Sequence, residues 1–346
     1  MFSTIRRSIF TLALLAAVTV AGQASAETLI NGAGATFPYP IYSKWFSEYA
    51  KIDHSVKFNY QSIGSGGGIK QITAQTVNFG ASDKPLSDAE LSAAAANGSK
   101  LLHIPTVMGA VVVTYNVPGV KTGLKLTSQD VADIYLGKIT KWNDPRIAGN
   151  NPGVHLPAKP IIVVHRSDGS GTTAIFTNFL CGVNNDWKTR IGTGTSVRWP
   201  IGLGGKGNEG VSGQVKTTNY TIGYVELAYA MENRLPFATL KNVSGHWVVP
   251  SIKTTSAAAA GAVKHMPADY RIALVNQPGK DAYPIAGFTY LLVYEHQKDK
   301  VIGRKLVEFL NWELQKGQKM ASALLYAPLP SNVAKMVAKT IRTIKY

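Results

Sequence analysis

The stretch PIIVVHRSDGSGTTAIFTNFL, residues 160–180, carries the pattern on which the rest of the chain is built. Its first part, Pro160 to His165, is an apolar, β-branched run typical of a buried strand. A polar loop from Arg166 to Thr173 follows, and the apolar spacing from Ala174 to Leu180 predicts a helix. A strand that leads through a small-residue loop into a helix is the repeating unit of α/β proteins, so we expect an α/β fold.

Three other loops share the design of Arg166–Thr172, with a strand before them and small hydroxyl-bearing or acidic residues in them. They are Ala35-Thr36-Phe37, Gly64-Ser65-Gly66 and Ser82-Asp83. A helix N-terminus presents free N–H groups and a partial positive charge, glycine allows close approach, and Ser or Thr adds a hydroxyl donor. One such turn is weak evidence, because Ser and Thr are ordinary helix caps. Several in one chain, one of them with an Arg, predict an anion site.

Further elements alternate along the chain in the same manner. The predicted strands are Thr28–Ile30, Val56–Tyr60, Val77–Ala81, Met108–Tyr115 and Phe288–Tyr294. One predicted helix begins at Pro38 or Pro40, a second runs from Ile69 to Thr76, and a third begins after a Ser87–Glu90 capping box. A fourth covers Val131–Leu136 after a cap at Thr127 or Ser128, and a fifth spans Gly303–Met320. The Gly-rich segment 32–36 is predicted as a turn.

Length and composition favour two domains. The chain has 346 residues, of which 45% are hydrophobic and 16% charged, and no long flexible linker divides it. Two domains without a linker predict a chain that crosses between them near Thr106–Gly109 and again near Pro284–Gly287. We therefore expect a discontinuous first domain, residues 27–106 plus 286–346, and a second domain of residues 107–285. A cleft between domains is a common place for a small ligand.

The N-terminus predicts export. Arg6 and Arg7 precede an apolar run, and Ala24-Ser25-Ala26 gives a cleavage site after Ala26, so residues 1–26 read as a signal peptide. The Sec and twin-arginine routes both stay open. The mature chain would have 346 − 26 = 320 residues and a net charge of +16 − 2 = +14. Its Lys and Arg residues are scattered, so nucleic acid is not an expected partner, and a solvated basic surface or steering of a small anion remains.

Catalytic, metal and cofactor chemistries find little support. Gly169-x-Gly171-x-x-Ala174 matches a dinucleotide pattern, but polar residues separate it from the strand and no acidic partner is evident. No Walker, G-x-S-x-G or H-E-x-x-H motif is present, and the single Cys181 excludes a multi-Cys metal site. No nucleophile stands beside a base. We expect neither a catalytic residue, a metal nor a cofactor.

Two carboxylates stand in loops that otherwise suit an anion. Asp83 and Asp168 could be plain turn or cap residues. Alternatively, a carboxylate accepts hydrogen bonds and cannot donate them, so it would favour an oxyanion that carries a proton over one that does not. Phosphate near neutral pH carries a proton and sulfate does not. Asp168 could also pair with Arg166, two residues away, and hold its planar fork in place.

A set of motifs, in order, closely resembles the high-affinity periplasmic phosphate-binding proteins of phosphate-specific ABC transporters. The motifs are Gly32-Ala33-Gly34-Ala35-Thr36-Phe37-Pro38, Gly80-Ala81-Ser82-Asp83, Tyr135-Leu136-Gly137-Lys138-Ile139, Arg166 to Thr172, and Trp199 to Gly207. The similarity extends from about Thr28 to Pro330. It implies a two-domain periplasmic-binding-protein fold of type II, with two crossover segments and the ligand cleft between the domains.

The resemblance also implies a set of phosphate-binding residues. Thr36, Ser65, Ser170 and Thr172 would donate hydroxyl hydrogen bonds, and Phe37 and Gly171 would donate backbone N–H groups. Asp83 would accept the phosphate proton, while Arg166 would bind phosphate oxygens and pair with Asp168. The expected protein is a monomeric, non-enzymatic periplasmic receptor that delivers phosphate to ABC-transporter permease subunits. A receptor for another tetrahedral oxyanion such as sulfate, and a secreted phosphatase, remain as alternatives.

Overall fold

The structure, a computed structural model, describes residues 27–346 and is built around one mixed eight-stranded sheet of order β2-β1-β3-β11-β4-β8-β6-β7. Its strands are β1 (Thr28–Gly34), β2 (Val56–Ser62), β3 (Phe79–Ser82), β4 (Leu101–Asn116), β6 (Ile162–Arg166), β7 (Leu203–Gly205), β8 (Thr221–Glu226) and β11 (Ala286–Tyr294). A second sheet joins β10 (Trp247–Val248), β9 (Thr239–Lys241) and β5 (Lys125–Thr127).

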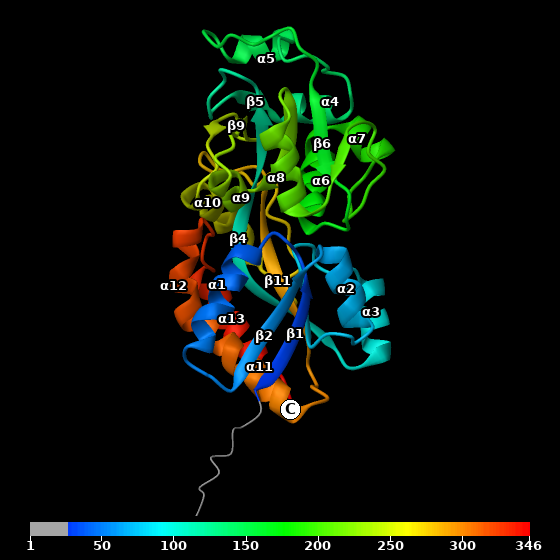
Figure 1. Cartoon of the computed structure of the whole chain (residues 1–346), viewed down its shortest axis with the longest axis vertical. Coiled ribbons are helices and arrows are strands. Elements are labelled where there is room, and N and C mark those ends of the chain that lie inside the picture. Colours follow the sequence, from blue (N-terminus) through cyan, green and yellow to red (C-terminus); the bar gives the residue numbers. More distant parts are fainter. Residues whose placement is uncertain (1–26) are drawn as a thin grey trace, which may run out of the picture.

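Helices divide between the two ends of an elongated molecule (Figure 1). The lower part holds α1 (Tyr39–Ala50), α2 (Ser65–Thr73), α3 (Asp88–Asn97), α11 (Lys300–Trp312), α12 (Gln318–Ala321) and α13 (Ser331–Ile341). The upper part holds α4 (Ser128–Tyr135), α5 (Pro145–Asn150), α6 (Gly171–Val183), α7 (Asn185–Arg190), α8 (Gly207–Thr217), α9 (Leu227–Glu232) and α10 (Ile252–Ala262). The lower part thus combines both ends of the described chain, and the upper part is its middle.

Strand β4 connects the two parts. From Leu101 to Ala110 it pairs antiparallel with β11, and from Val111 to Asn116 it pairs antiparallel with β8. Its burial is nearly complete along 16 residues, because neighbouring elements cover both faces. The change of partner falls next to the predicted crossing at Thr106–Gly109. The domain boundaries themselves stay a prediction.

An aromatic core joins the N- and C-terminal segments of the lower part. The Phe309 ring of α11 lies 4.5 Å from the Phe58 ring of β2 and 5.3 Å from the Phe46 ring of α1, centroid to centroid. Each buried aromatic side chain contributes a large apolar area, so this cluster fixes α11 against a sheet edge formed more than 200 residues earlier in the chain.

Most predicted elements are confirmed, with shifts at their ends. Ser87 caps α3 by a capping box with Glu90, as predicted, and Thr127, one of the two predicted caps, caps α4 by a box with Asp130. The predicted turn at residues 32–36 is wrong for its first part, since β1 continues to Gly34 and Gly32 lies against the Phe79 ring, where a Cβ would have no room. The predicted helix 303–320 is interrupted by a π-helical turn, Glu313–Gly317. Across residues 27–346, every helix is too short or too polar to span a bilayer.

Candidate oxyanion-binding site

The four loops predicted to bind an anion meet at the boundary between the lower and upper parts. The Gly66 N–H at the start of α2 donates to the Gly169 carbonyl oxygen of the loop before α6, at 2.8 Å. At Gly171, the first residue of α6, a Cβ would lie 2.4 Å from both Asp83 Oδ2 and Ser65 Oγ. Glycine is required here, because any side chain would fill the space where the loops converge.

The structure brings all nine predicted residues to this boundary and buries all of them except Asp168, which is partly buried. Exposed fractions are 0–3% for Thr36, Phe37, Ser65, Asp83, Arg166, Ser170 and Thr172. Gly171 is also buried and Asp168 is partly buried. A buried polar group without a partner is costly, so each of these groups needs a hydrogen bond from the protein or from a ligand.

The site hydroxyls accept hydrogen bonds from the protein, which leaves the protons of Thr36, Ser170 and Thr172 available, whereas Ser65 Oγ also donates a long bond to Asp83 Oδ2 at 3.5 Å. Ser170 Oγ accepts from the Thr173 N–H at 2.9 Å, as the cap of α6. Ser65 Oγ accepts from the Asp83 N–H at 3.2 Å, and Thr172 Oγ1 accepts from Arg166 Nη1 at 3.4 Å. A hydroxyl carries a single proton, so an oxygen that is held as an acceptor is free to donate to a ligand.

Asn208, at the start of α8, orients two of these hydroxyls at once. Its Nδ2 donates to Thr36 Oγ1 at 2.7 Å and to Thr172 Oγ1 at 3.2 Å. Its own Oδ1 accepts from the Glu226 N–H at 3.0 Å, which fixes the amide orientation. Sequence reasoning missed Asn208, although it directly follows the glycine-rich motif that ends at Gly207 and carries part of the family resemblance.

Arg166 and Asp168 form the predicted pair. Arg166 Nε lies 2.8 Å from Asp168 Oδ1, and Nη2 lies 2.6 Å from Oδ2, so the contact is bidentate. Burial alone would raise the pKa of Asp168, but the hydrogen bonds and charge of Arg166 hold the pKa of that carboxyl below its usual range. The Gly207 N–H also donates to Asp168 Oδ1. The pair is neutral overall, and the remaining guanidinium N–H groups can serve an anion.

Asp83 is a buried acceptor. Its Oδ1 accepts from the Thr289 hydroxyl at 2.8 Å, and Ser65 Oγ lies 3.5 Å from its Oδ2. Burial raises the pKa of Asp83 to about 7, an effect opposed by the Thr289 hydrogen bond and by the charge of Arg166. Thr289 was not predicted from the sequence, because it lies on a strand 206 residues later in the chain.

Two tyrosine hydroxyls fix the backbone carbonyls of Thr36 and Phe37, just before α1. Tyr229 Oη donates to the Thr36 carbonyl oxygen at 2.6 Å, and Tyr326 Oη donates to the Phe37 carbonyl oxygen at 2.6 Å. Tyr229 belongs to the upper part and Tyr326 to the C-terminal segment. Because their carbonyls are held, the N–H group of Phe37 is constrained in direction as well.

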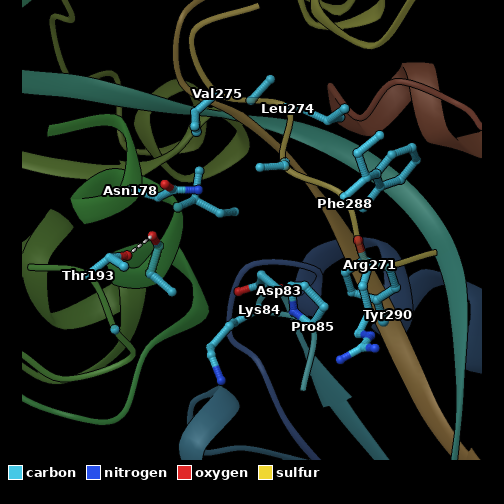
Figure 2. Close-up of a pocket in the computed structure, with 17 residues that line it drawn as sticks. Asp83, Lys84, Pro85, Asn178, Thr193, Arg271, Leu274, Val275, Phe288 and Tyr290 are labelled. Carbon is cyan, nitrogen blue, oxygen red and sulfur yellow. Dashed lines mark hydrogen bonds between the residues drawn. The ribbon is translucent and has the colours of Figure 1, made fainter. Parts of the chain in front are cut away.

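A pocket of about 340 Å³ reaches this site from one side. Figure 2 shows Asp83 on its wall with Lys84 and Pro85 beside it, Arg271 and Tyr290 next to Pro85, and Asn178 and Thr193 on the other side. Lys84 pairs with Glu90 and Arg271 with Asp88, so neither cation stands alone. Asp83 is the member of the predicted set that the pocket and the loop cluster share.

The arrangement offers several hydrogen-bond donors and one carboxylate acceptor in a buried setting. Hydroxyl groups, helix N-termini and a neutralised Arg suit a small oxyanion without adding net charge. The Asp83 carboxylate suits a proton on that oxyanion. Within the described residues, no three His, Cys, Asp or Glu side chains gather closely enough to hold a metal ion.

Comparisons with known proteins agree with this geometry. A model of the PBP superfamily domain matches residues 20–316. The phosphate-binding protein PstS of Pasteurella multocida (strain Pm70) is 47% identical over 315 residues, covering 91% of this chain and 90% of the relative. The phosphate-binding protein PstS of Xylella fastidiosa (strain 9a5c) is 46% identical over 309 residues, covering 89% of this chain and 83% of the relative.

The fold also matches a solved structure, that of PfluDING, a high-affinity periplasmic phosphate-binding protein bound with phosphate at pH 8.5. The TM-score is 0.72 at 24% identity, over 90% of this chain and 93% of that one, which shows a shared fold. The chain therefore has a periplasmic-binding-protein fold and belongs to the PBP superfamily. Within it, the chain belongs to the PstS family of phosphate-binding proteins.

Proposed function

We propose that the buried loop cluster binds one inorganic phosphate ion and that the protein is its receptor rather than an enzyme. The main support is that the site combines several hydroxyls whose oxygens already accept hydrogen bonds, and which can therefore donate, with one buried carboxylate acceptor, Asp83. Thr36, Ser65, Ser170 and Thr172 would donate hydroxyl protons, and Phe37 and Gly171 their N–H groups. Arg166, held by Asp168, would bind phosphate oxygens.

The proton on phosphate would be the basis of selectivity. Facing Asp83, a phosphate hydroxyl donates one hydrogen bond, whereas sulfate would place two acceptors against each other with no hydrogen between them. An unsatisfied buried pair of this kind costs several kcal/mol. The neutral Arg166–Asp168 pair supports this reading, because net charge alone would favour every dianion equally.

The remaining parts of the proposal concern transport. Residues 27–106 plus 286–346 and residues 107–285 would be two domains that close over phosphate, with β4 and β11 as the crossover segments. The protein would act in the periplasm as a monomer, after cleavage behind Ala26, and deliver phosphate to the permease subunits of an ABC transporter. The signal peptide lies outside the described residues. Family membership and the contacts between Gly66 and Gly169 across the boundary support the proposal.

Receptors for sulfate and secreted phosphatases were the other candidate classes. Asp83 disfavours sulfate for the reason given above. Hydrolysis of a phosphoryl group needs a metal or a nucleophile beside a base. The relatives are named for phosphate binding, not for hydrolysis.

Calorimetric titration of phosphate into ligand-stripped mature protein tests the proposal directly. We expect tight binding with one phosphate per chain, unaffected by excess sulfate. In Asp83→Asn, the amide can donate to an unprotonated oxygen, so sulfate should compete at least tenfold better than in the wild type. Asp133→Asn, a buried carboxylate in α4 away from the site, is the matched control and should leave the preference unchanged. Absence of phosphate heat, or equal competition by sulfate in the wild type, would contradict the proposal.

A further inference from the structure

Thr289, in the middle of β11, has a hydroxyl group directed at the site carboxylate. The residue is fully buried, and its Oγ1 donates to Asp83 Oδ1 at 2.8 Å. Its neighbours on the strand, Phe288 and Tyr290, line the pocket of Figure 2, whereas Thr289 does not, as expected for a side chain on the other face of the strand. Burial of a hydroxyl group inside a sheet is unfavourable unless it forms a hydrogen bond, and Asp83 provides that partner.

The two oxygens of Asp83 face different surroundings. Oδ1 is taken by Thr289, from the sheet. Oδ2 points toward the first turn of α6, since it lies 2.4 Å from the position that a Cβ on Gly171 would occupy. Apart from a long hydrogen bond from Ser65 Oγ at 3.5 Å, Oδ2 therefore keeps its acceptor capacity for a ligand.

A β-bulge opposite Thr289 holds this strand in place. Thr289 pairs with Val107 and Tyr290 with Pro105, so Thr106 is an extra residue in β4. Thr106 Oγ1 donates to the Thr289 carbonyl oxygen at 3.2 Å, and the Thr106 carbonyl oxygen accepts from Gln318 Nε2 at 2.8 Å. The carbonyl oxygens of Thr289 and Thr106 at the bulge therefore both accept hydrogen bonds from side chains.

The direction of the hydrogen bonds in this network follows from counting protons. Tyr42 Oη lies 2.8 Å from Thr106 Oγ1. The single Thr106 hydroxyl proton is already directed at the Thr289 carbonyl, so Tyr42 must be the donor in that contact. Every hydroxyl in the chain Tyr42, Thr106, Thr289 then donates, and Asp83 is an acceptor at Oδ1.

We infer that Thr289 is a positioning residue that keeps Asp83 as an ionised acceptor, with Oδ2 turned to the ligand, and thereby sets the discrimination between a protonated and an unprotonated oxyanion. The inference rests on the proposed function and deepens it, because it names a residue outside the predicted binding set. Without the Thr289 donor, protonation of Asp83 becomes easier. A protonated Asp83 can donate to sulfate, and it must lose its proton before it accepts one from phosphate.

Other charged and titratable groups surround Asp83, and a substitution of Thr289 leaves all of them in place. They are Arg166 with its partner Asp168, Lys84 with Glu90, Arg271 with Asp88 and Asp269, and the phenols of Tyr42, Tyr60 and Tyr290. Burial raises the pKa of each of these phenols well above neutral, so they remain uncharged in the experiment. The titration that differs between variants is that of Asp83.

The test compares the wild type with Thr289→Val, which removes the hydroxyl and keeps the shape. Phosphate and sulfate affinities of each variant are measured by calorimetry from about pH 5.5 to 9. Because phosphate itself titrates in the same way in every experiment, its own protonation cancels when the variants are compared at equal pH. In Thr289→Val, the pH below which phosphate affinity declines should move upward by about one to two units. The phosphate-to-sulfate preference near pH 7 should fall about ten- to hundredfold. Thr289→Ser keeps the donor and should restore both.

Controls separate this role from a structural one. Thr114→Val removes an equally buried hydroxyl from the same sheet, where it donates to the Pro236 carbonyl oxygen, and should change neither readout. Thr289→Ala provides a second donor-free variant should the valine protein not fold. In an Asp83→Asn background, Thr289→Val should have no further effect on sulfate. If folded donor-free variants keep the wild-type pH profile and preference, the inference is wrong, while failure of the wild type to bind phosphate would instead overturn the proposed function.

Discussion

At the scale of single residues, the site depends on which atom supplies each proton. Asn208 donates to the Thr36 and Thr172 hydroxyl oxygens, which belong to opposite parts of the molecule. Each hydroxyl is then a donor of fixed direction before any ligand arrives. An oriented donor needs no reorganisation on binding, so its hydrogen bond contributes more to affinity than that of a free rotor.

Removal of this amide should therefore weaken phosphate binding. For Asn208→Ala we expect a loss of about 1–3 kcal/mol, or roughly five- to hundredfold in Kd, by calorimetry. Asn208→Asp should be worse, because a carboxylate accepts the hydroxyl protons and adds negative charge. Asn116→Ala, whose amide bonds the Val215 and Lys216 carbonyls away from the site, is the control and should leave Kd unchanged. Wild-type affinity in Asn208→Ala would refute the orientation argument.

Residue types predicted much of the candidate site, but not all of it. Hydroxyls, Asp83 and Arg166 stand in loops before helices, and that local pattern is visible in the sequence. Asn208 and Thr289 reach the same place through contacts 172 and 206 residues apart along the chain. Neither has a local pattern that distinguishes it from an ordinary helix or strand residue, so only the fold reveals it.

At the scale of elements, the loops before α2 and α6 approach each other more closely than side chains would allow. Gly66 and Gly169 are in backbone contact across the boundary. Gly64 has a φ of +87°, and a Cβ there would lie 2.3 Å from Asp168 Oδ2 and 2.5 Å from the Gly169 carbonyl oxygen. The glycine thus meets two requirements, a left-handed backbone and a close neighbour from the other part.

Gly64→Ala should separate these loops. We expect phosphate affinity to fall at least tenfold, because the methyl group displaces Asp168 and with it the Arg166 fork. Gly213→Ala is the matched control: it lies exposed in the middle of α8 with no neighbour within 4 Å of its Cβ position. It should raise the free energy of unfolding by about 0.5–1 kcal/mol and leave binding unchanged. Thermal unfolding with and without phosphate measures both; equal ligand stabilisation in the two variants would contradict the prediction.

Element ends were harder to predict than element types, for physical reasons. The helix α2 starts at Ser65, four residues before the predicted Ile69, and its glycines at 66–68 take helical geometry where neighbours lie too close for side chains: Gly169 at Gly66, the Ile63 side chain at Gly67, and the backbone of β1 and β3 at Gly68. The π-helical turn at Glu313–Gly317 adapts the chain to Trp45, whose Nε1 donates to the Gly317 carbonyl oxygen. Both shifts are caused by tertiary neighbours that a local pattern does not contain.

At the scale of the whole molecule, the chain carries a large net positive charge, although the ion pair in the site is neutral. Removal of residues 1–26 would leave a net charge of +14 by sequence, that is +16 − 2. Because the charge acts from a distance, it should raise the rate of phosphate association rather than slow its release.

Stopped-flow measurement at two ionic strengths tests this prediction. Between about 10 mM and 150 mM salt the Debye length shortens from ~30 Å to ~8 Å, and we expect the association rate constant to fall several-fold. The dissociation rate constant should stay nearly constant, since the contacts that hold phosphate are buried. A salt effect confined to dissociation would show that the basic surface has no part in capture.

The place of β11 in the sheet has a consequence for how the chain is made. It is the last strand in sequence, yet it lies between β3 and β4 near the middle of the sheet order. During synthesis or vectorial export, residues 107–285 emerge with β6, β7 and β8 complete, while β3 and the first ten residues of β4 wait with open edges. Open edges invite pairing with other chains. A chaperone that shields unpaired strands would therefore matter most in the interval before residue 286 appears.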